Sequence, residues 1–138
     1  MAVYIGERKF VRVDSDLEIL ESNFELIGKR VVDVGCGYGG LTALLAPKVM
    51  EIYGIDHAPI VSEIVEKRSD IRRNEVYQIG SAENLQLPDN YSDIMLFIAS
   101  FHHIPDDAMT AALNEIVRVS RNGGHVLILE PVSEQGTY

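Results

Sequence analysis

Residues 31–40 read VVDVGCGYGG, in which an apolar run containing one acid passes into four glycines within six residues. The apolar part has the length and composition of a strand that is buried on both faces. Closely spaced glycines after such a strand indicate a sharp turn that leaves room for a ligand, because a side chain would fill that space. The stretch therefore predicts the first strand and the ligand-binding loop of an α/β domain.

The glycine spacing fits a dinucleotide-binding loop without distinguishing between cofactors. Gly35, Gly37 and Gly40 satisfy G-x-G-x-x-G, and Asp56 follows Gly35 by 56 − 35 = 21 residues, near the distance expected for a ribose-binding acid. Asp33 favours S-adenosylmethionine over a dinucleotide. At the carboxyl end of the first strand it would repel a pyrophosphate, whereas it would attract the ammonium and sulfonium groups of S-adenosylmethionine.

Short apolar runs alternate with helix-like patterns along the rest of the chain. The runs that predict strands are residues 30–34, 52–55, 76–79, 94–98 and 125–129. Pro47 would end one helix after the glycine loop, Pro59 would open a second, and residues 109–117 carry apolar side chains at helical spacing. The alternation predicts a doubly wound parallel sheet of the α/β class.

The chain reads as a single domain over residues 1–138, with residues 1–28 as an N-terminal extension before the first strand. Ser15 and Glu18 have capping-box spacing and predict a helix in this extension. Residues 10–13 are too short a segment to assign. No repeat, low-complexity tract or linker divides the sequence.

Composition narrows the classes of partner. The 138 residues are 46% hydrophobic and 24% charged, which fits one soluble domain. The net charge is −9 and the basic residues are scattered, so nucleic acid and anionic membranes are disfavoured as partners. No apolar run approaches the ~20 residues that span a bilayer. Cys36 is the single cysteine and cannot form an intrachain disulfide, which favours a cytoplasmic location.

Four stretches of the chain together form a recognisable series. They are VVDVGCGYGGLTALLA (31–46), IYGIDHAP (52–59), QIGSAENLQLPDNYSDIMLFIASFHHIPD (78–106) and LNEIVRVSRNGGHVLILEP (113–131). In order and spacing they resemble the successive motifs of small-molecule methyltransferases of the ubiquinone/menaquinone-biosynthesis type. The resemblance covers residues 29–131. It implies a class I, S-adenosylmethionine-dependent methyltransferase with a Rossmann-like sheet in the strand order 3-2-1-4-5.

The resemblance also implies a role for each matching position. Asp33 would accept a hydrogen bond from the amino group of the methionine moiety, directly or through water, and Asp56 would accept hydrogen bonds from both ribose hydroxyls. The family usually has Asp at the position of Ser81, where the Ser81 hydroxyl or the Glu83 carboxylate would contact the adenine amine instead. The whole predicted cofactor-binding set is Asp33, Gly35, Cys36, Gly37, Gly39, Asp56, His57, Ser81, Ala82, Glu83 and Ala99.

His102 and His103 are the candidate catalytic residues. They begin the loop beside the transferable methyl group, where either could act as a base toward a hydroxyl or an acidic carbon. The alternative is a helix-capping or packing role. No metal site is expected, because no carboxylate or cysteine cluster stands at ligand spacing around them.

The end of the sequence raises a question of assembly. Relatives add a sixth and a seventh strand, whereas this sequence stops shortly after residues 125–129. We therefore expect an uncovered fifth-strand edge, and a homodimer or other defined oligomer that buries it.

Three other functions stay open at this point. One is a non-catalytic module that binds S-adenosylmethionine or a partner. A second is an NAD(P)-dependent oxidoreductase, which Asp33 and the lack of a Tyr-x-x-x-Lys pair disfavour. The third is an aminopropyltransferase, for which no acidic polyamine-binding motif follows the fourth strand.

Overall fold

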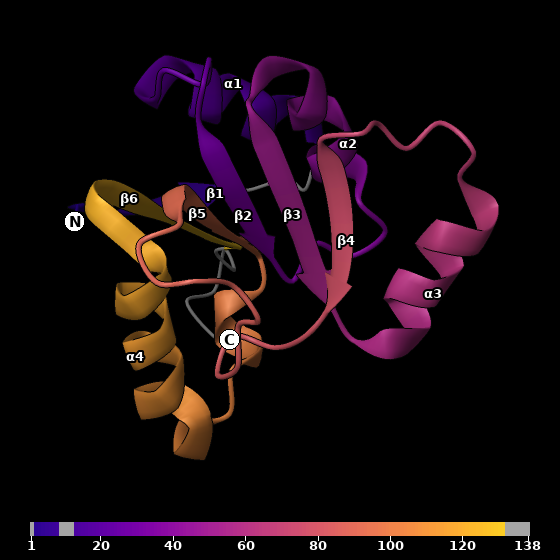
Figure 1. Ribbon diagram of the computed structural model, residues 1–138. Coiled ribbons are helices and arrows are strands. Elements are labelled where there is room, and N and C mark those ends of the chain that lie inside the picture. The colour runs from indigo at the N-terminus through magenta and orange to yellow at the C-terminus, as the bar shows by residue number, and fades with distance from the viewer. Residues whose placement is uncertain (1, 9–12, 132–138) are drawn as a thin grey trace.

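The computed structural model describes residues 2–8 and 13–131, and side chains from Asp16 onward. Six parallel strands form one sheet with helices on both faces (Figure 1). The strands are β1 (Ala2–Arg8), β2 (Arg30–Val34), β3 (Glu51–Asp56), β4 (Glu75–Ile79), β5 (Ser92–Ile98) and β6 (Ser120–Pro131). The helices are α1 (Val13–Asn23), α2 (Gly40–Leu45), α3 (Ala58–Lys67) and α4 (Met109–Val119), with 3₁₀ turns at Ala46–Lys48, Phe101–His103 and Asp106–Ala108.

The sheet has the order β1-β6-β5-β2-β3-β4. The five predicted strands are β2, β3, β4, β5 and β6, and their order of 3-2-1-4-5 is confirmed. The chain therefore reverses direction across the sheet between β2 and β5. This reversal is the topological switch point at which open α/β sheets bind ligands.

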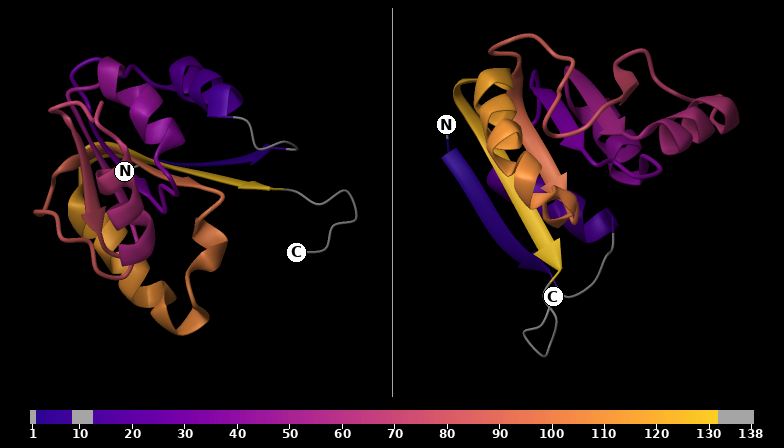
Figure 2. Two further views of the ribbon diagram at one scale, coloured as in Figure 1. Left: turned by 90° about the vertical axis from the view of Figure 1, so that its right-hand side faces the viewer. Right: turned by 90° about the horizontal axis from the view of Figure 1, so that it is seen from below.

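The expectation of an uncovered fifth-strand edge is wrong. β1 pairs in parallel with β6 in a register that runs from Ala2 opposite His125 to Arg8 opposite Pro131. The views in Figure 2 show β1 lying along the outer side of β6. The dimer predicted through that edge loses its physical basis, because the backbone groups it would have paired already face β1. Residues 1–28, set apart as an extension, thus supply an edge strand and the helix α1.

Two apolar clusters fill the space between the sheet and its helices. Alternate residues of each strand face opposite sides, as Leu96 and Phe97 of β5 do. α1 and α2 cover one face with side chains such as Leu20 and Leu45, whereas α4 covers the other with Ile116 (Figure 2). α3 packs beside β3 and β4 at the end of the sheet (Figure 1). Side chains buried from both faces explain the continuous apolar runs in the strands.

Several predicted boundaries hold and others move. Pro59 lies in the first turn of α3, and Pro47 lies in the 3₁₀ turn directly after α2. α1 begins at Val13, before the proposed cap Ser15, and the other residues of segment 10–13 lie outside the described part. β6 begins at Ser120, directly after α4, and not at residue 125.

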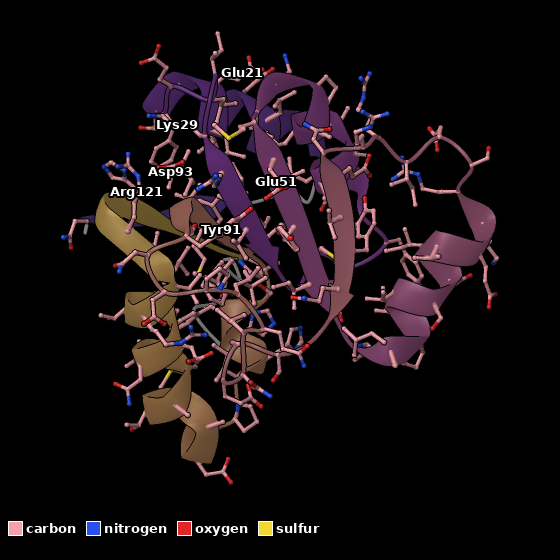
Figure 3. All side chains as sticks on the ribbon, in the orientation of Figure 1. Glu21, Lys29, Glu51, Tyr91, Asp93 and Arg121 are labelled. Carbon is pink, nitrogen blue, oxygen red and sulfur yellow. The ribbon has the colours of Figure 1, made fainter. Side chains whose placement is uncertain are left out.

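The amino ends of the strands carry a polar cluster (Figure 3). The Tyr91 hydroxyl donates to the Glu51 carboxylate, and the guanidinium of Arg121 pairs with Asp93. Asp93 also accepts the backbone N–H of Arg30 at 2.7 Å. These contacts close the end of the sheet opposite to the site described below. No helix in the described ranges is long and apolar enough to cross a membrane.

Candidate cofactor site

A cavity of about 580 Å³ opens at the carboxyl ends of β2, β3 and β5. The glycine loop, the end of β3, the loop at residues 80–83 and the segment at residues 99–105 form its walls. Its apolar surfaces come from side chains that sequence reasoning did not select, namely Val34, Ile55, Ile60, Phe97, Ile104 and Pro105. Its size is that of a typical small-molecule site, and it lies at the switch point of the sheet.

The glycine loop is shaped by positive backbone φ angles at Gly35, Gly37 and Gly39. A side chain at Gly35 would collide with Ser100, because its Cβ would lie 2.5 Å from the Ser100 Cβ. A Cβ at Gly37 would meet nothing within 4 Å, although Gly37 lines the cavity. Gly35 therefore lets the segment after β5 approach the loop, and Gly37 leaves its side of the loop open to a ligand.

Asp56 connects the end of β3 to this loop. Its Oδ2 accepts the backbone N–H of Gly37 at 2.9 Å, and its Oδ1 lies 2.8 Å from the His57 backbone nitrogen and 2.7 Å from His57 Nδ1. Both residues line the cavity, and the Asp56 side chain is 15% exposed. A carboxylate oxygen can accept more than one hydrogen bond, so Oδ2 retains capacity for a ligand hydroxyl.

The loop after β4 forms the wall opposite the glycine loop. Ser81, Ala82 and Glu83 all line the cavity, as the predicted adenine contacts would. Ser81 closes a tight turn by accepting the Asn84 backbone N–H at 3.1 Å. The Gly80 backbone N–H donates to the Asp56 backbone oxygen at 3.0 Å, which ties this loop to the end of β3.

Two residues of α4 hold this loop from behind, and sequence reasoning missed both. Glu115 accepts the Leu85 backbone N–H at 2.7 Å, and the Arg118 guanidinium donates to the carbonyls of Leu85 and Leu87, each at 2.8 Å. Arg118 also pairs with Glu115 at 2.7 Å. The i, i+3 spacing of Glu115 and Arg118 was visible in the sequence, but their contact with a loop some 30 residues earlier was not.

Asp33 lies outside the cavity lining. It is 2% exposed and its Oδ2 accepts the Thr42 hydroxyl at 2.7 Å. Burial raises its pKa to about 6, an effect that the Thr42 hydrogen bond reduces and the nearby charges of Asp56 and Asp16 increase. A buried, largely ionised carboxylate behind the glycine loop makes a cation favourable nearby.

Cys36 and Gly39 also lie outside the cavity lining. Burial raises the pKa of the Cys36 thiol well above its ordinary range, so it is neutral and not a nucleophile at pH 7. Gly39 is covered by Tyr77, whose Oη would lie 2.6 Å from a Cβ at that position. These two positions shape the loop from the side of the protein, and Tyr77 is a support that sequence reasoning missed.

The segment after β5 completes the site. Ala99 lines the cavity in a left-handed backbone conformation with φ 55°, and the Ser100 hydroxyl donates to the Val34 carbonyl at 2.7 Å. The two candidate catalytic histidines separate at this point. His103 lines the cavity, whereas His102 does not and instead pairs with Glu130. No group of three or more His, Cys, Asp or Glu side chains is placed to hold a metal ion within residues 16–131.

The fold and the cavity can now be compared with known proteins. The family model described as a methyltransferase domain matches residues 32–128. The chain belongs to the methyltransferase domain family. This match runs from β2 to β6 and so includes every wall of the cavity. It confirms the prediction of a methyltransferase core and disfavours the oxidoreductase and aminopropyltransferase alternatives.

Curated relatives of this domain are methyltransferases as well. An uncharacterized methyltransferase, YcgJ of Bacillus subtilis, is 32% identical over 73% of this chain and 40% of its own length. A demethylmenaquinone methyltransferase of a Geobacillus strain is 32% identical over 75% of this chain and 45% of its own length. The chain thus spans less than half the length of these two relatives.

Solved structures show the same fold. The YcgJ protein of Bacillus subtilis superposes with a TM-score of 0.74 at 27% identity, over 85% of this chain and 50% of the other. Phosphoethanolamine N-methyltransferase 1 of Haemonchus contortus, solved with phosphoethanolamine and S-adenosylhomocysteine, gives a TM-score of 0.73 at 29% identity, over 85% of this chain and 25% of the other.

Proposed function

We propose that this methyltransferase domain binds S-adenosylmethionine in the cavity and transfers its methyl group to a small molecule. The observation that carries the proposal is the position of Asp56. Its carboxylate lies at the cavity wall on the end of β3, beside the open backbone of Gly37, and retains acceptor capacity. In Rossmann-like folds, a carboxylate at this position binds the ribose of a nucleoside ligand.

The other walls supply the remaining contacts of such a ligand. Loop residues Ser81, Ala82 and Glu83 would hold the adenine, and His57, which follows Asp56 and lines the same cavity, would lie beside it. Gly35 and Gly37 would let the ligand lie against the backbone, and Ala99 lines the same cavity. The negative charge of Asp33 lies behind this loop and would favour a cationic amino acid moiety, with water as the bridge because Asp33 is buried.

The protein's contribution to the reaction is to orient the acceptor toward the methyl group and to exclude water. The bound cofactor supplies a methyl group on a positively charged sulfur, which is already an activated leaving group. The apolar wall formed by Phe97 and Ile104 would keep water from the reacting atoms. Of the two candidate catalytic histidines, His103 is the one that lines the cavity and so would be the base for an acceptor that loses a proton.

The acceptor is a small molecule in this proposal, and the relatives guide the choice of probes. Their names include a demethylmenaquinone methyltransferase, a tocopherol O-methyltransferase and a fatty-acid O-methyltransferase. The net charge of −9 and the scattered basic residues support a small molecule over nucleic acid. The single Cys36, which cannot form an intrachain disulfide, supports a cytoplasmic location.

Calorimetric titration with S-adenosylhomocysteine and with NAD tests the cofactor. We expect binding of S-adenosylhomocysteine and none of NAD; equal or tighter binding of NAD would overturn the proposal. Transfer of a labelled methyl group from S-adenosylmethionine is then measured with a phenol, a hydroxyquinone, a fatty acid and phosphoethanolamine, on this chain and on a longer form. Cofactor binding without transfer to any acceptor would favour a non-catalytic binding module.

A further inference from the structure

Glu130, near the end of β6, makes two hydrogen bonds to one residue of the neighbouring segment. Its Oε1 accepts the backbone N–H of His102 at 3.1 Å, and its Oε2 lies 2.5 Å from His102 Nδ1. β5 and β6 are neighbours, with Ile98 opposite Leu129, so the sheet itself brings Glu130 beside the turn that follows β5. The Glu130 side chain is 24% exposed and the His102 side chain is 47% exposed.

The turn that Glu130 holds also carries a cavity residue. His102 and His103 lie in the 3₁₀ turn Phe101–His103, and their ring centroids are 4.0 Å apart with a 42° tilt. His103 lines the cavity, whereas His102 and Glu130 do not. A continuous set of contacts therefore runs from the Glu130 carboxylate through the His102 ring to the His103 ring and the cavity.

The chemistry of this pair restricts the state of His102. A carboxylate only accepts hydrogen bonds, so the nitrogen facing it, Nδ1, must carry the proton. In a neutral ring Nε2 is then the acceptor. Glu130 also accepts the backbone N–H of His102, so it holds the main chain of the turn as well as the His102 ring.

Few other contacts hold this turn. Phe101 packs edge-on against Phe97 with ring centroids 5.4 Å apart, and the His103 backbone N–H donates to the Ser100 carbonyl at 3.1 Å. Neither contact fixes the direction of the His103 ring. Among the described residues, the aromatic ring that contacts the His103 ring is that of His102, which Glu130 holds.

We propose that Glu130 is a positioning residue of the methyl-transfer site. It fixes the tautomer of His102 and, through His102, holds the His103 ring at the cavity to accept a proton from the methyl acceptor. The inference rests on the proposed function and narrows its acceptor to one that loses a proton, such as a hydroxyl or an acidic C–H. In this step the acceptor's O–H or C–H bond breaks and an N–H bond forms on His103. The resulting positive charge lies one ring away from the Glu130 carboxylate.

The first test is the tautomer of His102 in the full chain labelled with ¹⁵N-histidine. The four histidines are few enough to assign by substitution. We expect His102 to be protonated at Nδ1 in the original protein and to shift toward the Nε2-protonated form in Glu130→Leu, with the ring signals of His103 moving as well. The signals of His125 should not move. An Nε2-protonated His102 in the original protein, or unmoved His103 signals in Glu130→Leu, would overturn the proposal.

The second test separates positioning from cofactor binding. Glu130→Gln keeps the length and removes the charge, so it serves if Glu130→Leu does not fold, and Glu66→Gln on α3 is the matched control. We expect the Kd for S-adenosylhomocysteine to stay within about twofold in both variants. With the probe acceptor that turns over, kcat should fall at least about tenfold in Glu130→Gln with KM unchanged, and not in Glu66→Gln.

The results distinguish the two proposals. Failure of the original protein to bind S-adenosylhomocysteine would overturn the proposed function, whatever the histidine spectra show. Normal binding and turnover with kcat unchanged in Glu130→Gln would leave the function standing and would overturn the role of Glu130.

Discussion

The carboxylate of Asp56 holds the backbone N–H of Gly37 at 2.9 Å, so the acid that ends β3 also fixes the loop that follows β2. One side chain therefore joins two walls of the cavity before any ligand enters. A site assembled this way is preorganised, because the carboxylate cannot turn away without releasing the glycine loop. A change at Asp56 should therefore affect ligand binding in two ways, because it removes an acceptor for the ligand and also releases the backbone of Gly37.

Replacement of Asp56 by Ala should weaken binding of S-adenosylhomocysteine by about 1.5–3 kcal/mol for each charge-assisted hydrogen bond lost. The domain should remain folded, because the side chain faces the cavity and not the core. Calorimetry measures the affinity, and circular dichroism checks the fold. Asp107→Ala, at an exposed position before α4, is the control. Unchanged affinity, or a defect that is mainly unfolding, would show that Asp56 is misassigned.

Replacement of Asp33 by Asn should stabilise the protein in a pH-dependent way. Burial raises the pKa of Asp33 from 3.8 to about 6, so the folded state holds the proton more tightly than the unfolded state. The stability from this group is present below about pH 4 and is lost as the pH rises through 6. At pH 8 the neutral Asn, which can still accept the Thr42 hydrogen bond, should gain as much as about 3 kcal/mol over Asp.

Urea unfolding at pH 4 and pH 8 measures this effect, and the gain should be close to zero at pH 4. Asp107→Asn should show no such difference between the two pH values. The same Asp33→Asn variant should lose affinity for S-adenosylmethionine, since it removes the charge behind the glycine loop. A gain of equal size at both pH values would contradict the assigned pKa shift.

Replacement of Gly39 by Ala should destabilise the fold more than the same change at Gly123. Both glycines have nearly the same positive backbone φ angle, 80° and 79°. The left-handed conformation costs an alanine roughly 1–2 kcal/mol at either site. At Gly123 the new Cβ would meet nothing within 4 Å, whereas at Gly39 it would lie 2.6 Å from the Tyr77 hydroxyl oxygen. The difference between the two variants in urea unfolding isolates the contact with Tyr77, and equal losses would refute it.

Replacement of Arg118 by Lys should loosen the loop at residues 81–87, which includes the proposed adenine contacts. The planar guanidinium reaches the carbonyls of Leu85 and Leu87 together with the Glu115 carboxylate, and a lysine ammonium cannot reproduce that fork. We expect faster amide exchange at residues 81–87 and a several-fold weaker affinity for S-adenosylhomocysteine. Arg73→Lys, at an exposed position, should change neither. Protection of the loop equal to that of the original protein would exclude this role for Arg118.

The sequence predicted the features that local patterns encode. Five strands and their order followed from apolar runs and from motif resemblance, and Pro59 marked the start of α3. Contacts between distant segments left no local pattern. Arg118 reads as an ordinary exposed helix residue, and Tyr77 reads as one residue of a strand, until the fold places them against loops.

The two adjacent histidines show the same limit at a finer scale. Their sequence neighbourhood made His102 and His103 equivalent candidates, because both follow β5 in the same turn. A 3₁₀ turn sends neighbouring side chains in different directions, so one ring reaches the cavity and the other reaches Glu130. The His102 ring is paired with Glu130 of β6, which lies 28 residues later in the chain.

The pairing of β1 with β6 also bears on how the protein folds as it is made. β1 leaves the ribosome long before its neighbour β6, since Ala2 lies opposite His125. Until β6 has been made, the backbone groups of β1 cannot form the hydrogen bonds that pair them with the β6 residues Val126–Leu129. Closing a loop of this length is slow, and unpaired strand edges attract other chains. We therefore expect the protein to be most prone to aggregate during synthesis, before β1 and β6 have paired. The supply of chaperones should then set the yield of folded protein.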